Sequence, residues 1–131
     1  MAASTFVPVS LDPPLVAICV QNTSTTWPRL AQQSRIGISL LGVDHESIVR
    51  TMAAKDIDRF TGVETETHCK GALFISGSSL WLDVSVDEQL PAGDHAVALL
   101  RVNEIHCRPE AEVPIEPIVF HRSALRKLMT T

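Results

Sequence analysis

Residues 80–106 read LWLDVSVDEQLPAGDHAVALLRVNEIH, and this stretch decides the fold class. Within it, residues 80–86 alternate between apolar side chains and a second face that carries Asp83, which is the period of a half-buried β-strand. Residues 91–94 (PAGD) are typical of a turn, and residues 95–106 follow as a longer strand. Because only a turn joins them, the two strands are predicted to pair antiparallel.

Shorter apolar segments elsewhere in the chain predict further strands, over residues 6–10, 15–20, 35–41 and 117–121. Two short helices are expected, one from Pro28 to Ser34 with Ser24 or Thr25 as its N-cap, and one from His45 to Ala54 capped by Asp44. A doubly wound parallel sheet would need regular strand–helix alternation, which is missing after residue 70. The sequence therefore predicts a mostly β domain, with an antiparallel sheet closed into a barrel and helices at its edge.

Length and composition limit the class of protein. A chain of 131 residues is expected to form one domain, spanning residues 1–131. Eleven basic residues against fifteen acidic ones give a net charge of -4, which argues against binding to nucleic acid or to an anionic membrane. No apolar run approaches the roughly 20 residues of a membrane helix, and no signal peptide is visible. The odd cysteine count (Cys19, Cys69 and Cys107) predicts reduced thiols in a cytoplasmic protein.

A hydroxyl-rich loop, Asn22 to Thr26 (NTSTT), leads into the first expected helix. Free N–H groups and the helix dipole attract anions at such a position, so hydroxyls and amides together could cradle a phosphate. The alternative is ordinary helix capping, which the residues taken alone favour.

The tripeptide Gly93-Asp94-His95 lies at the turn before the long strand. Asp94 could orient His95, and a histidine at the mouth of a strand can contact a ligand or move a proton. The alternative is a hairpin turn that carries an exposed histidine.

Two His-Cys dipeptides, His68-Cys69 and His106-Cys107, are candidate metal ligands by residue type. Adjacent residues on a strand point to opposite faces, so neither dipeptide is expected to chelate a metal, and no metal site is predicted. The sequence also lacks a G-x-G-x-x-G motif, a phosphate-binding P-loop, a G-x-S-x-G elbow and an H-E-x-x-H motif.

Six short motifs, in order and over nearly the whole chain, resemble the flavin reductase-like family. They are Ser4-Thr5-Phe6, Val9 to Leu15 (VSLDPPL), Asn22 to Trp27 (NTSTTW), Asp58 to Val63 (DRFTGV), Gly93-Asp94-His95, and Pro117 to Arg122 (PIVFHR). Members of this family have an FMN-binding split β-barrel with Greek-key topology. They are the small NAD(P)H:flavin oxidoreductase components of two-component monooxygenases and their relatives.

The resemblance implies a role for each matching residue. Ser4 and Thr5 match positions that contact the ribityl or phosphate region of the flavin, and the backbone of Ser10 and Leu11 matches the segment along the isoalloxazine. His95 matches a catalytic position near the stacked nicotinamide or flavin. The phosphate-side loop is matched by Asn22, Ser24, Thr25 and Thr26.

The same resemblance implies the cofactors and partners. FMN or FAD is the expected flavin, with NADH or NADPH as co-substrate, and the cofactor itself supplies the hydride chemistry. A homodimer and a partner flavin-dependent monooxygenase are expected. One alternative is a split barrel without catalytic activity that acts through a protein partner. Another is an oxidase or haem-handling split barrel, against which the G-D-H and D-P-P motifs argue.

Two departures from the family pattern are visible. Members usually begin with a helix and a strand before the position of Met1, and this sequence shows neither. Three explanations are open: the start is misplaced or trimmed, the domain is a natural short form that lacks them, or a partner covers the gap. Ala2 stands where the family often has threonine, so one hydroxyl on the flavin side is lost.

Overall fold

Strands dominate the computed structural model, which describes residues 1–54, 58–107 and 116–129. The described residues form nine strands, two α-helices and one 3-10 helix (η1). In chain order these are β1 (Val7–Leu11), β2 (Pro14–Gln21), α1 (Trp27–Leu30), β3 (Ile36–Leu40), η1 (Val43–His45), α2 (Glu46–Ala53), β4 (Thr65–Thr67), β5 (Leu73–Ile75), β6 (Leu80–Ala92), β7 (His95–Cys107), β8 (Ile118–His121) and β9 (Ala124–Lys127).

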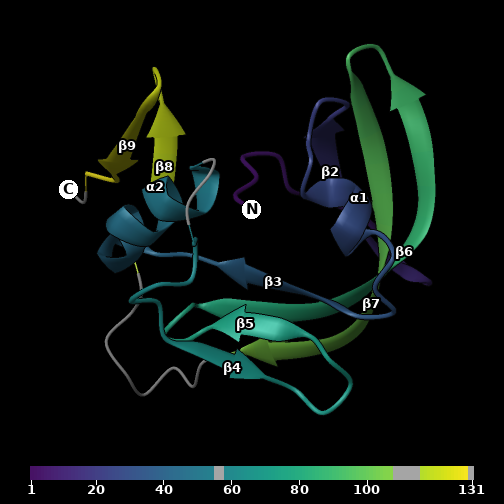
Figure 1. Cartoon of the computed structure of the whole chain (residues 1–131), viewed down its shortest axis with the longest axis horizontal. Coiled ribbons are helices and arrows are strands. Elements are labelled where there is room, and N and C mark those ends of the chain that lie inside the picture. The colour runs from purple at the N-terminus through teal and green to yellow at the C-terminus, as the bar shows by residue number, and fades with distance from the viewer. Residues whose placement is uncertain (55–57, 108–115, 130–131) are drawn as a thin grey trace.

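The predicted central hairpin is confirmed, and it is longer than the pattern suggested. β6 and β7 pair antiparallel from Leu80 opposite Cys107 to Ala92 opposite His95. Two residues close the turn, and Gly93 adopts a φ of 65° there, a conformation that suits glycine. The pairing shifts register twice along β6, and such bulges bend a strand. The bent hairpin therefore runs from the upper right of the molecule into its lower layer (Figure 1).

The main sheet has the strand order β1-β2-β7-β6-β3. The β6–β7 hairpin thus lies between β2 and β3, so the chain crosses over it in a connection of Greek-key type. Among the described strands, β4–β5 and β8–β9 form two separate two-stranded sheets. The mostly β, antiparallel prediction is confirmed, whereas the described hydrogen bonds do not close the sheet into one continuous barrel.

The core is aliphatic and lies against the middle of the main sheet. Alternate residues of β2 point inward, and they meet buried side chains of β6 and β7. Each fully buried side chain of this kind contributes about 1.5–3 kcal/mol. The buried cluster consists of Val16, Ile18, Val20, Trp27, Ile36, Leu82, Val84, Ala98 and Leu100.

Asp83 corrects the prediction that β6 has one polar, half-buried face. The residue is only 1% exposed, and its Oδ1 lies 2.7 Å from Nη1 of Arg35. Both faces of β6 are covered at this point, because Leu82 and Val84 on the other face are buried as well. Burial of a carboxylate requires such a partner, which period-two alternation could not reveal.

Both helices differ from the sequence prediction. α1 has four residues and ends well before Ser34, because the polar residues that follow Ala31 are exposed and have no apolar side to bury. Its N-cap is Thr26, not Ser24 or Thr25. α2 follows η1 and its N-cap is His45, not Asp44. No helix in the described ranges combines the length and the apolar character needed to cross a membrane.

The C-terminal segment also corrects the prediction of a single strand followed by a basic tail. The tail returns as β9, which pairs with β8 from Ala124 opposite His121 to Lys127 opposite Ile118. Arg122 and Ser123 form the turn with φ values of 50° and 58°. Neither residue is a usual choice for this conformation, which explains why no turn was predicted there.

Candidate functional site

Two predicted site segments that are distant in sequence meet at one end of the main sheet. The backbone N–H of Asn22 donates to the carbonyl of Asp94 at 2.9 Å, and its side-chain amide donates to the carbonyl of Gly93 at 3.1 Å. One residue earlier, Gln21 of β2 pairs with His95 of β7. The hydroxyl-rich loop and the Gly93-Asp94-His95 turn therefore form one continuous rim.

The hydroxyls of the loop take part in local hydrogen bonds. The Ser24 hydroxyl oxygen accepts the backbone N–H of Trp27 at 3.1 Å. Ser24 therefore satisfies a free N–H at the start of α1, although Thr26 occupies the N-cap position. An accepting hydroxyl still has its own hydrogen to donate, and it could bind an anion. Because α1 is one turn long, however, its dipole adds little to the predicted phosphate cradle.

Arg59 supplies a positive charge to this loop that the loop's own residues do not carry. Its Nη1 donates to Oγ1 of Thr26 at 3.2 Å, and the residue is half-buried. Burial, and secondarily the charge of Arg59, lower the pKa of the Met1 amino group, so Arg59 also lies near the first residues. The D-R-F motif was visible in the sequence, but nothing in its spacing indicated which loop it would reach.

Asp58 helps to shape the segment that carries Arg59. Its carboxylate accepts the backbone N–H of Phe60 at 3.0 Å. This hydrogen bond, followed by one from Thr61, lowers the pKa of the exposed Asp58 carboxyl. Asp58 therefore stays ionised and holds the local turn at neutral pH.

His95 is oriented by its neighbour. Its Nδ1 lies 2.7 Å from Oδ1 of Asp94, the arrangement that the sequence suggested. This hydrogen bond, and then the charge of His95, lower the pKa of the exposed Asp94 carboxyl. With Nδ1 engaged, Nε2 is left to meet a ligand at the rim.

The structure does not bring Ser10 and Leu11 to this rim. Ser10 pairs with Leu15, which lies near the opposite end of β2. Leu15 is seven residues before Asn22 in the chain. That spacing corresponds to about 23 Å along a strand. Ser4 and Thr5 precede Val7, which pairs with Ala17, so they lie toward the rim end of β1.

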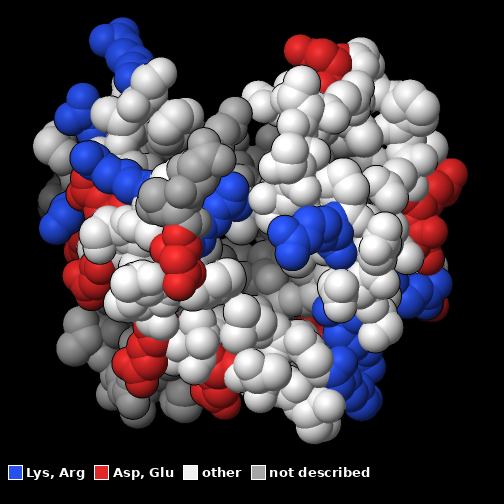
Figure 2. Space-filling view, in the orientation of Figure 1, with Lys and Arg blue, Asp and Glu red and all other residues white. Residues whose placement is uncertain are grey.

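The site is open to the surface. Figure 2 shows the molecule hollowed between the lobe formed by α2, β8 and β9 and the lobe formed by α1, β2 and the β6–β7 hairpin (labels in Figure 1). A pocket lies between α2 and the β8–β9 hairpin, and its lining includes none of the predicted flavin-binding residues. It is lined by Val43, Glu46, Ile118, Leu125, Arg126 and Lys127.

Comparison with known proteins extends over the whole domain. Residues 1–129 match the family model of the flavin reductase like domain. Among curated proteins, the actinorhodin polyketide dimerase of Streptomyces coelicolor is 34% identical over 104 residues, covering 79% of this chain and 59% of that protein. A flavin reductase of Pseudomonas putida is 31% identical, with coverage of 84% and 65%. HsaB, the reductase subunit of a flavin-dependent monooxygenase of Rhodococcus jostii, is 29% identical, with coverage of 92% and 60%.

A solved structure agrees with these relatives. The NADH:FAD oxidoreductase SgcE6 of Streptomyces globisporus, in complex with NAD and FAD fragments, superposes with a TM-score of 0.89 at 28% identity. The match covers 98% of this chain and 76% of that one. The chain spans less than two thirds of the length of the three curated relatives. The match over residues 1–129 places the protein in a family: this chain belongs to the flavin reductase like domain family.

Proposed function

We propose that the chain is a flavin reductase, which transfers hydride from NADH or NADPH to FMN or FAD. The observation that carries the proposal is the rim itself, in a domain of this family. There the Asn22–Thr26 loop contacts Arg59 at Thr26 and the Gly93–His95 turn at Asn22. Related proteins named as a flavin reductase and an NADH:FAD oxidoreductase support the reaction class.

The donor groups at the rim fit the phosphate of a flavin mononucleotide. Arg59 offers guanidinium N–H groups beside Thr26, and Ser24 offers a hydroxyl hydrogen. Charged and neutral donors of this kind are the ligands that phosphate prefers. Ser4, Thr5 and Asn22 would bind the same end of the flavin, with Thr25 completing the loop.

His95 would position the reacting partners. The Asp94 carboxylate engages Nδ1 of His95. Nε2 of His95 is then the one ring nitrogen available to donate a hydrogen bond to the ligand or to accept one from it. Bound flavin would supply the ring that accepts hydride from the nicotinamide. Ser10 and Leu11 would contact the ring only if the flavin lies along β1, with its phosphate at the rim.

The proposed reductase activity implies partners for the chain. We propose that the reduced flavin passes to a partner monooxygenase, which is supported by the relative named as a monooxygenase reductase subunit. A homodimer is supported by β1, an edge strand of the described sheet that exposes Val7, Val9 and Leu11. A cytoplasmic location is supported by the free cysteines Cys19, Cys69 and Cys107.

Titration with FMN, FAD and riboflavin side by side tests the proposal, followed by assays of NADH and NADPH oxidation. Saturable quenching of flavin fluorescence that is strongest for a phosphorylated flavin, together with flavin-dependent oxidation of a nicotinamide, is the expected result. A folded chain that binds no flavin would exclude the reductase proposal and favour a split barrel that acts through a protein partner.

A further inference from the structure

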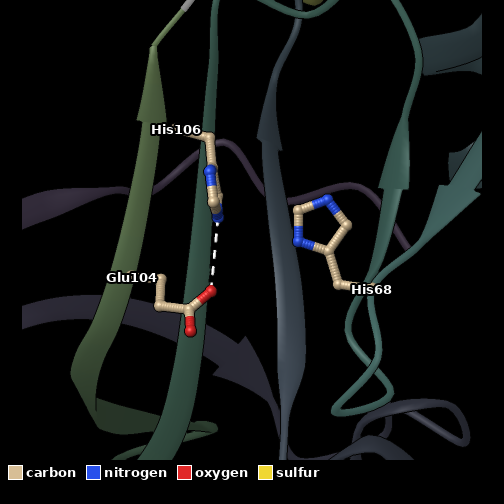
Figure 3. Close-up of side chains that lie close together, drawn as sticks. All are labelled: His68, Glu104 and His106. Carbon is tan, nitrogen blue, oxygen red and sulfur yellow. Dashed lines mark hydrogen bonds and ion pairs between the residues drawn. The ribbon is translucent and has the colours of Figure 1, made fainter.

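His68 and His106, one histidine from each His-Cys dipeptide, lie close together. They do so at the end of β7 opposite His95. His68, Glu104 and His106 each offer one ligand atom, and the three atoms lie within 4.8 Å of one another. Figure 3 shows the Glu104 carboxylate next to the His106 ring, joined to it by a dashed line, with the His68 ring facing them from another segment. The grouping joins the two dipeptides across the fold, so the spacing within either dipeptide does not indicate it.

The backbone holds all three residues in place. Glu104 and His106 are two residues apart on β7, so their side chains share one face of the strand. His68 follows β4 and begins a tight turn. The N–H of His68 donates to the carbonyl of Ala72, and the N–H of Gly71 donates to the carbonyl of His68, both at 2.9 Å. The three ligands therefore come from two rigid segments.

The His68 and His106 rings pack against aromatic side chains. The His68 ring makes an edge-to-face contact with Phe74 at a centroid distance of 4.8 Å and with Trp81 at 5.7 Å. Trp81 pairs with His106 across β6 and β7. The His68 and His106 rings are themselves 4.8 Å apart at an interplanar angle of 83°. This packing limits the rotation of the imidazoles, and the His68 and His106 side chains remain 21% and 42% exposed.

The nitrogen and oxygen positions suit a metal ion. Nε2 of His106 lies 3.3 Å from Oε2 of Glu104. Ligands about 2.0–2.2 Å from a tetrahedral ion lie about 3.3–3.5 Å apart, so this pair already has the required spacing. Closing the widest separation of 4.8 Å to that spacing needs a movement of about 1.4 Å.

Neighbouring charges complete the arrangement. Oε1 of Glu66 lies 3.7 Å from Nε2 of His68, so a carboxylate backs one nitrogen of the ring and Nδ1 is left for an ion. Lys70 approaches Glu104 at 3.5 Å, but its side chain is 56% exposed and can swing into solvent.

We propose that His68, Glu104 and His106 bind one divalent transition-metal ion of the Zn²⁺ class, with water completing the coordination. Two imidazoles and one carboxylate are a donor set that Zn²⁺ and Co²⁺ accept. The ion would link the turn after β4 to the long strand β7 and stabilise their contact. The proposal does not depend on flavin binding, because none of its residues belongs to the rim.

Titration of the metal-free full chain tests the proposal, with Zn²⁺ followed by calorimetry and Co²⁺ followed by visible absorption. We expect one ion per chain, a rise in the thermal midpoint with Zn²⁺, and Co²⁺ bands typical of four or five ligands. His68→Phe keeps the aromatic packing and removes a ligand, and His106→Asn removes the other. Each should weaken Zn²⁺ binding by at least about tenfold, since even outer-shell partners are worth 10–100-fold.

Two controls separate this site from other ligands. His121→Asn removes an exposed histidine outside the group and should leave the affinity unchanged. Cys69→Ser with Cys107→Ser removes the neighbouring thiols and should also leave it unchanged. Circular dichroism confirms that each variant is folded. The proposal is overturned if the folded wild type binds Zn²⁺ no more tightly than the histidine variants, or if binding disappears with the thiols.

Discussion

Replacing Arg59 by methionine removes the positive charge at the rim while keeping a side chain of similar length. A hydrogen bond to a charged group contributes about 1.5–3 kcal/mol. At about 1.4 kcal/mol per factor of ten, this corresponds to a loss of roughly 10- to 150-fold in affinity. Arg59 is half-buried, so solvent screens part of its charge, and we expect the lower end of that range for FMN.

The assay compares FMN with riboflavin, which has the same ring and no phosphate. Arg59→Met should weaken FMN by about tenfold and riboflavin hardly at all, measured by quenching of flavin fluorescence. Arg29→Met is the matched control, because Arg29 lies on α1, close to the same loop, and no side-chain hydrogen bond is described for it. Equal losses for FMN and riboflavin, or an equal effect of Arg29→Met, would refute the assignment of the phosphate to Arg59.

Four further predictions concern the site and the fold. His95→Ala should lower the rate of NADH-dependent flavin reduction more than it weakens flavin binding; an unchanged rate at saturation would contradict the role. The hydrogen bond from His95 lowers the pKa of Asp94 in the folded protein. The Asp94–His95 pair therefore stabilises the fold at pH values above the ordinary pKa of an aspartate, and this stabilisation is lost as the pH falls through the lowered pKa. NMR titration should therefore find the Asp94 pKa below its ordinary value, and closer to it in His95→Ala. Arg35→Met leaves the buried carboxylate of Asp83 without its partner and should cost about 3–5 kcal/mol in urea unfolding; a loss below about 1 kcal/mol would argue against the ion pair. Gly37→Ala places a Cβ 1.9 Å from a backbone oxygen of β5, so stability should fall by about 3 kcal/mol, and an unchanged midpoint would contradict the close packing.

The sequence predicted those features that depend on local pattern. The β6–β7 hairpin was recognisable because alternation and a Gly-Asp turn are both encoded within a few residues. The Asp94–His95 contact is likewise local, between adjacent residues. The three-residue strands β4 and β5 were missed because segments that short carry almost no periodicity.

Contacts between distant segments could not be predicted in this way. Arg59 reaches Thr26 across 33 positions, and Arg35 reaches Asp83 across 48. Both contacts join segments that are far apart in the chain, so no local pattern of residues indicates them. The meeting of His68 with His106 depends on the turn after β4, which no short motif in the sequence predicts.

The most direct test of the reductase proposal is an anaerobic mixing experiment with the purified chain, FMN, and NADH or NADPH. We expect the absorption of oxidised flavin and that of reduced nicotinamide to disappear together, one for one, at a rate proportional to the amount of protein added. Binding of FMN by the folded chain with no reduction by either nicotinamide would contradict the proposal.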